Sequence, residues 1–109
     1  MIALHADQYD LQKWAFRNFG IQTSSQMLLG AMEELGELAH AHLKKEQEIR
    51  KNEDHDEKAR DAVGDIIIYL MQYCSLRNWD IETVISDAVE AVLSRDWKIN
   101  PIDGVKHGD

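Results

Sequence analysis

The feature that most constrains this chain is a spacing of apolar residues three and four positions apart, which almost nothing interrupts. The 109 residues include six glycines and a single proline, Pro101. This spacing places apolar side chains along one face of a helix. Because 109 residues leave no room for a second domain, we expect residues 1–109 to form one all-α domain of four helices.

Start and stop signals divide the chain into these helices. The expected helices run from about His5 to Asn18, from the candidate caps Thr23–Ser25 to about Arg50, from the cap Asp54 to the break at Asn78-Trp79-Asp80, and from Ile81 to about Lys98. Residues 51–57 read as a charged solvent loop. After Pro101 ends the fourth helix, we expect residues 98–109 to be an extended or mobile tail.

Two short acidic clusters lie beside the apolar stripes of the second and third helices. The first contains Glu33, Glu34 and Glu37, and the second contains Asp61 and Asp65. Residues three or four apart share a helix face, so each cluster supplies a carboxylate pair. Carboxylates held close together beside a core repel each other and lose hydration, which is costly unless cations neutralise them. The two clusters therefore indicate a metal site.

Mg²⁺ suits such a site because it prefers oxygen ligands, keeps several waters and shares carboxylates with substrate phosphates. Gly36 and Gly64 immediately precede Glu37 and Asp65, in helix interiors where glycine costs about 1 kcal/mol relative to alanine. A close approach of the helices, or space for metal and water, would explain these glycines. Ordinary small residues at a helix crossing would also explain them.

Together these motifs resemble the MazG-like family of all-α nucleoside triphosphate pyrophosphohydrolases, which is related to the dimeric dUTPases. The resemblance covers essentially the whole chain and is carried by Gly20, the segment 33–40 (EELGELAH), the run 61–70 (DAVGDIIIYL) and the ending 95–98 (RDWK). The family's second motif is usually Glu-x-x-Asp, which would place glutamate at Ala62. We expect Asp61, one residue earlier, to replace it.

The resemblance implies a four-helix MazG-like bundle whose core is completed by oligomerisation, as a homodimer or homotetramer. It implies hydrolysis of an NTP or dNTP to the monophosphate and pyrophosphate. The cofactor would be Mg²⁺, with Mn²⁺ as an alternative, held by Glu34, Glu37, Asp61 and Asp65. Glu33 would act as an outer ligand or help to deprotonate the attacking water.

Basic and aromatic residues supply candidates for substrate contacts. Lys44 lies two turns beyond Glu37 on the same face, where it would reach a phosphate or remain a solvated surface lysine. Arg95 and Lys98 would contact phosphate, as the resemblance implies, or satisfy the carbonyls at the end of the fourth helix. Trp14 is the preferred candidate for stacking on a base, although most tryptophans in small helical proteins anchor the packing.

Charge and composition exclude several classes of partner. With 12 basic and 20 acidic residues, the chain has a net charge of -8, which argues against a nucleic-acid polymer as partner. The longest apolar run, Ile66 to Met71, is too short to span a membrane. No signal-peptide pattern is visible, so we expect a cytoplasmic protein. The single cysteine, Cys74, is expected to be buried.

Two other interpretations stay open. Glu37 to His40 is a Glu-x-x-His unit of the kind that di-iron and di-manganese carboxylate bundles use in pairs, but the sequence contains no second unit. The other interpretation is a non-catalytic helical dimer that binds a nucleotide or a partner. The missing glutamate at position 62 favours it.

Overall fold

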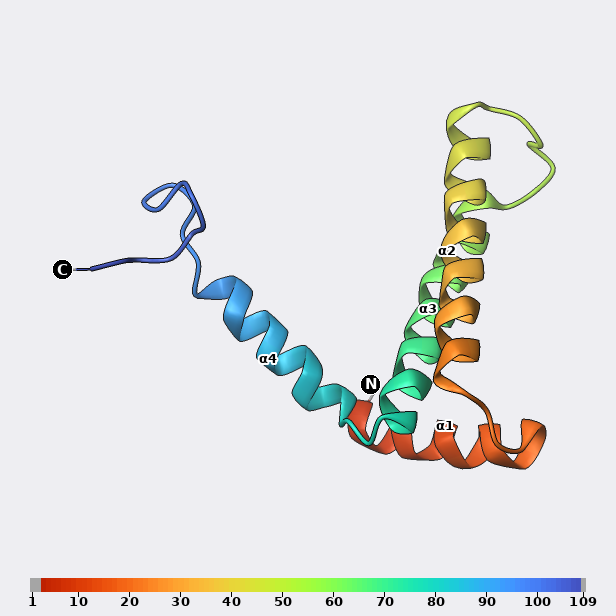
Figure 1. Cartoon of the computed structure of the whole chain (residues 1–109). Helices are drawn as coiled ribbons and strands as arrows, with labels where there is room; N and C mark the ends of the chain where they lie inside the picture. Colours follow the sequence, from red (N-terminus) through yellow and green to blue (C-terminus); the bar gives the residue numbers. More distant parts are fainter. Residues whose placement is uncertain (1–2, 109) are drawn as a thin grey trace.

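A computed structural model of the chain describes residues 3–108, which form four α-helices and no strand (Figure 1). The helices are α1 (Leu4–Phe19), α2 (Ser24–Glu46), α3 (His55–Leu76) and α4 (Ile81–Leu93). The prediction of an all-α chain with four helices is confirmed. Within the described range, none of these helices combines the length and the apolar character that crossing a membrane requires.

The helices α2 and α3 form an antiparallel hairpin, and α1 crosses its base (Figure 1). In contrast, α4 leaves as a separate arm that contacts only α1 and α3. The chain is accordingly extended, with dimensions of 56 × 41 × 29 Å. The helix α3 therefore packs against the other three helices, and most of α4 projects away from them.

Local side-chain hydrogen bonds begin α2, α3 and α4 where the sequence predicts. Thr23 and Gln26 form a complete capping box at the start of α2. Asp54 and Asp80 each accept a hydrogen bond from the backbone N–H three residues later, which caps α3 and α4. Gly20 follows α1 with a φ of 71°, a conformation that glycine adopts without strain.

Two helices end earlier than predicted. The prediction carried α2 to about Arg50, but α2 ends at Glu46, and Glu48 and Arg50 both have positive φ angles. Likewise α4 ends at Leu93 rather than about Lys98. Its continuation is broken because the Asp96 carboxylate accepts hydrogen bonds from the backbone N–H groups of residues 98 and 99.

The tail predicted over 98–109 is not extended throughout. Residues 95–104 form a compact hook, closed by a 2.8 Å hydrogen bond from the Asp96 N–H to the Gly104 carbonyl oxygen. Gly104 is buried against Arg95 and Trp97, with a φ of 77°. Residues 105–108 have no regular structure, and Asp109 lies outside the described residues.

A small core forms where α1, α3 and the start of α4 meet. Met71, Cys74 and Ile81 are buried there, and Leu4 and Leu11 pack against them. The predicted burial of Cys74 is confirmed. Burial also raises the pKa of the Cys74 thiol, so the thiol is protonated at neutral pH and fills space as a small apolar group.

Gln8 joins three elements of this core. Its Nε2 donates to Ser75 Oγ at 3.1 Å and to the Trp79 carbonyl oxygen at 2.8 Å. Its Oε1 accepts from the backbone N–H of Ile81 at 2.8 Å. The carboxamide therefore holds α1, the end of α3 and the first residue of α4 together, and so determines where α4 leaves the core.

Many apolar residues that the sequence places on buried stripes are exposed in the single chain. They include Leu28, Leu29, Met32 and Leu35 of α2, Val63, Ile67 and Leu70 of α3, and Val84, Ile85, Ala88, Val89, Val92 and Leu93 of α4. The accessible surface is 8751 Å². A compact monomer of this mass would expose about 6,200 Å², so the excess is about 2,500 Å². No other part of residues 3–108 covers these stripes.

Candidate functional site

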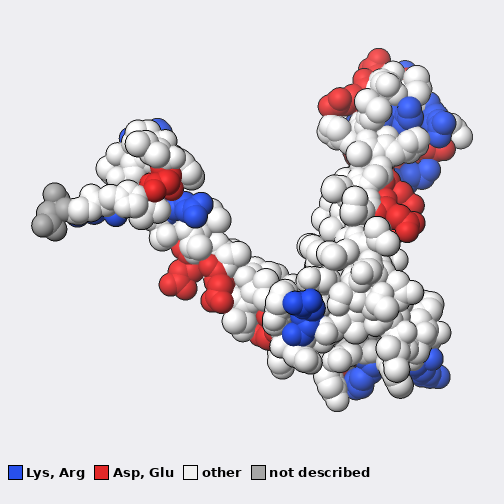
Figure 2. All heavy atoms as spheres, in the orientation of Figure 1, with Lys and Arg blue, Asp and Glu red and all other residues white. Residues whose placement is uncertain are grey.

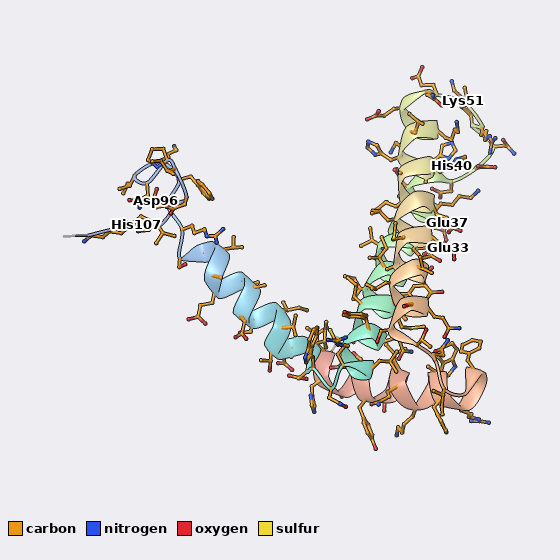
Figure 3. The ribbon with its side chains drawn as sticks, in the orientation of Figure 1. Glu33, Glu37, His40, Lys51, Asp96 and His107 are labelled. Carbon is orange, nitrogen blue, oxygen red and sulfur yellow. The ribbon has the colours of Figure 1, made fainter. Side chains whose placement is uncertain are left out.

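The α2–α3 hairpin carries a groove of about 710 Å³ that acidic residues of both helices line. We call it the acidic groove; its charged and titratable lining residues are Glu33, Glu37, His40, Lys58, Asp61 and Asp65. Figure 2 shows acidic side chains gathered partway along the hairpin, and Figure 3 shows Glu33 and Glu37 on successive turns of α2. Four of the five predicted carboxylates thus share one surface.

The fifth carboxylate, Glu34, lies deeper between the helices. Its Oε2 is buried and has no hydrogen-bond partner among residues 3–108. Loss of hydration raises the pKa of Glu34, and the negative charges of Glu37 and Asp65 raise it further. A buried carboxylate oxygen without a donor is costly, and a nearby cation would relieve that cost. The chemistry of these donors therefore fits a hard divalent cation.

The carboxylates share a surface without converging on a single point. Within the described range, no three His, Cys, Asp or Glu side chains are placed to hold a metal ion as they stand. Glu37, Asp61 and Asp65 are exposed, so their side chains can change rotamer at small cost. A cation bound in the groove would have to draw them inwards.

The two glycines beside these carboxylates do not mark a close helix crossing. A Cβ added to Gly36 or Gly64 would meet nothing within 4 Å. The close approach lies instead at Gly30, where a Cβ would overlap the ring of Tyr69 on α3. Of the explanations offered for Gly36 and Gly64, tight helix packing is therefore wrong, and open space beside the acidic groove agrees with the structure.

A second cavity, of about 640 Å³, adjoins the acidic groove between α1 and the hairpin. We call it the aromatic pocket; it is lined by Leu11, Trp14, Ala15, Phe19, Gln22, Met27, Glu34, Asp65, Ile68, Tyr69 and Gln72. Trp14 and Phe19 meet edge to face, with ring centroids 5.6 Å apart. The structure thus brings Trp14 to the same cavity as Glu34 and Asp65.

The basic residues singled out from the sequence do not reach the acidic groove within one chain. Lys44 donates to Gln47 Oε1 at 3.2 Å near the end of α2 and does not line the groove. Arg95 and Lys98 belong to the hook at the far end of the α4 arm, the region of Asp96 in Figure 3. The structure therefore separates these three residues from the carboxylates.

Lys58 is the basic residue that the sequence analysis missed. It lines the acidic groove, and its Nζ lies 3.1 Å from Glu53 Oε2. This hydrogen bond lowers the pKa of Glu53. Lys58 comes three residues before Asp61 on α3, so helical periodicity alone could have placed it on the same face.

Asp65 connects the two cavities, because it is the residue that lines both the acidic groove and the aromatic pocket. Carboxylates, a lysine and a tryptophan therefore occupy one continuous region of α1, α2 and α3. When the chain is compared with protein-family models, with curated proteins and with solved structures, nothing matches.

Proposed function

We propose that the protein is a Mg²⁺-dependent nucleoside triphosphate pyrophosphohydrolase of the MazG-like type, which converts an NTP or dNTP and water to the monophosphate and pyrophosphate. The observation that carries this proposal is the position of Asp65 between the acidic groove and the aromatic pocket. A nucleoside triphosphate has matching parts: a polyanionic chain that binds through cations, and a base that stacks on aromatic rings.

In this proposal Glu34, Glu37, Asp61 and Asp65 would hold Mg²⁺, and the ion would screen the charge of the triphosphate and help to activate water for attack. Glu33, on the wall of the acidic groove, accepts a proton from the water that attacks the α-phosphorus. A bond forms between the water oxygen and that phosphorus, and the bond to the α,β-bridging oxygen breaks. Lys58 neutralises charge on the departing pyrophosphate.

We further propose that the protein works as a homodimer or homotetramer. Each copy has about 2,500 Å² of surface in excess of a compact monomer, so a dimer that buried all of it would bury about 5,000 Å² in total, at the upper end of the range of about 2,000–5,000 Å² for obligate interfaces. The uncovered apolar face of α4 contributes to it. Arg95 and Lys98 stay phosphate-binding candidates only across such an interface, from one copy to the groove of another.

The test is to incubate the protein with NTPs, dNTPs and modified nucleotides plus Mg²⁺ and to measure pyrophosphate. We expect release that chelation of Mg²⁺ stops and that Asp65→Asn abolishes. Glu90→Gln, on the exposed α4 arm, makes the same change of charge and should leave the rate unaltered.

Two outcomes would replace this proposal. Folded protein that releases no pyrophosphate from any nucleotide would favour the non-catalytic binder. Purified protein that is coloured and contains iron or manganese would favour the di-metal carboxylate bundle, in which Glu37 and His40 would be ligands.

A further inference from the structure

One wall of the aromatic pocket carries a buried polar group that the proposed reaction does not use. Gln72 of α3 is only 8% exposed and lines the pocket. Its Nε2 donates to the backbone carbonyl oxygen of Leu11 on α1 at 3.2 Å. A carbonyl oxygen can only accept, so this bond directs the amide nitrogen towards α1 and the carboxamide oxygen away from it.

The carboxamide oxygen of Gln72 is therefore an unused acceptor. Oε1 receives no hydrogen bond from residues 3–108, and it is not sealed from solvent as Glu34 Oε2 is. Gln72 also lines a smaller apolar cavity that adjoins the aromatic pocket on the other side of Met27 and Ala15. A ligand that enters between α1 and the hairpin thus meets a hydrogen-bond acceptor in an otherwise largely apolar wall.

The spacing along α3 relates this acceptor to the acidic groove. Gln72 follows Asp65 by seven residues, two helical turns, so the two share a face about 10 Å apart along the axis. That distance is of the order of the length of a nucleoside together with its first phosphate. A nucleotide whose phosphates lie at Asp65 would therefore bring the far edge of its base to Gln72, with the half-exposed ring of Trp14 available for stacking.

We propose that Gln72 selects nucleotides whose base carries an amino group at the pyrimidine C4 or purine C6 position, which are cytosine and adenine nucleotides. This inference rests on the proposed function, because it assumes that the phosphates occupy the acidic groove. An amino group there donates to Oε1. Uracil, thymine, hypoxanthine and guanine place a carbonyl oxygen there instead, which leaves two acceptors facing each other with no proton between them.

The experiment uses two matched pairs of nucleoside monophosphates, CMP with UMP and AMP with IMP, whose binding requires no hydrolysis. Titrations followed by tryptophan fluorescence should give an affinity at least about tenfold higher for the amino-bearing member of each pair. Gln72→Met has a similar length but no acceptor, and should bring both ratios close to one. Gln47→Met changes an exposed glutamine that follows α2 and lines neither cavity, and should preserve them.

Equal affinities within both pairs for the native protein would overturn the proposal, even if Gln72→Met fails to fold. So would an undiminished preference in folded Gln72→Met, or the absence of binding by all four nucleotides. The preference without pyrophosphate release would refute the proposed hydrolysis alone. Pyrophosphate release at equal rates from CTP and UTP, with equal binding of CMP and UMP, would refute only the role of Gln72.

Discussion

The ring of Tyr69 on α3 lies against the backbone of Gly30 on α2, in the space that a side chain at residue 30 would fill. This contact lets the two helices approach each other near the base of the hairpin. It also holds Tyr69 in the wall of the aromatic pocket. The packing of the hairpin and the shape of the candidate site therefore depend on the same pair.

We expect Gly30→Ala to lower the free energy of unfolding by about 1–3 kcal/mol, because the added methyl overlaps the Tyr69 ring. Gly64→Ala is the matched control: its Cβ would meet nothing within 4 Å, so helix propensity should raise stability by up to about 1 kcal/mol. Urea unfolding of both variants measures the difference. Equal stabilities would contradict this account of the hairpin.

Glu34→Gln should stabilise the protein at neutral pH in the absence of divalent cations. The pKa of Glu34 is raised above its ordinary value of 4.5, so the folded chain keeps this proton to a higher pH than the unfolded chain. Its contribution to stability is complete below pH 4.5 and is lost as pH rises through the raised pKa. The melting temperatures of the native protein and of Glu34→Gln should therefore be similar in acid and differ at neutral pH, where the variant is the more stable protein.

Mg²⁺ should make the native protein more stable than Glu34→Gln, the reverse of the order expected without divalent cations. A cation that binds only the folded chain raises its melting temperature, and the native protein should gain more than Glu34→Gln because its carboxylate is a proposed ligand. Thermal unfolding with and without MgCl₂ checks this prediction. Equal gains in the two proteins would show that Glu34 does not contact the ion.

Asp61→Asn should reduce turnover by at least about tenfold while the helical circular dichroism stays unchanged. Asp61 is exposed and lines the acidic groove, so its loss should alter metal binding rather than folding. Asp87→Asn, at an exposed position on α4, is the control with the same chemical change. Full Mg²⁺-dependent activity of Asp61→Asn would show that Asp61 does not replace the glutamate expected at position 62.

The ion pair between His5 and Asp80 should make stability depend on pH. His5 Nδ1 lies 2.7 Å from Asp80 Oδ1; this hydrogen bond raises the pKa of His5 above 6.5 and lowers the pKa of Asp80 below 3.8. The His5 contribution is complete below pH 6.5 and is lost as pH rises through the raised pKa. The Asp80 contribution is present above pH 3.8 and is lost as pH falls through the lowered pKa.

His5→Gln should therefore destabilise the protein most between these two pH values and least in alkali, where histidine is neutral. Unfolding experiments across this range at low salt measure the difference, since salt screens exposed pairs. His42→Gln, whose partner Glu46 lies on the same helix, should not alter the attachment of α4. A difference between native protein and His5→Gln that is constant with pH would contradict the prediction.

The elements that could be predicted from the sequence are those with local causes. Caps such as Thr23 and Asp80 accept hydrogen bonds from N–H groups three residues away, so the sequence locates three helix starts directly. The acidic groove was predictable for a similar reason, since carboxylates one turn apart share a face. The antiparallel packing of the adjacent helices α2 and α3 then brings the carboxylates of the two helices together.

What the sequence could not predict depends on contacts distant in the chain. The contact between Gly30 and Tyr69 and the hydrogen bond between Gln72 and Leu11 depend on how the helices pack against one another. The apolar spacing on α4 predicts a buried stripe, but no other described residue covers this stripe, because apolar spacing does not say which surface will cover it. The hook forms because the Asp96 carboxylate accepts hydrogen bonds from the N–H groups of residues 98 and 99, which would otherwise continue the hydrogen bonding of α4.

The hydrogen bonds of Gln8 have a consequence for the shape of any assembly. The Gln8 carboxamide holds the start of α4 by accepting a hydrogen bond from the Ile81 N–H. Gln8→Leu would leave that N–H without its acceptor, and the angle between α4 and the core would no longer be fixed by this hydrogen bond. A change of one side chain near the amino terminus would then swing the hook through a wide arc. The geometry of a multimer that formed through α4 would thus depend on Gln8, which lies far from the interface itself.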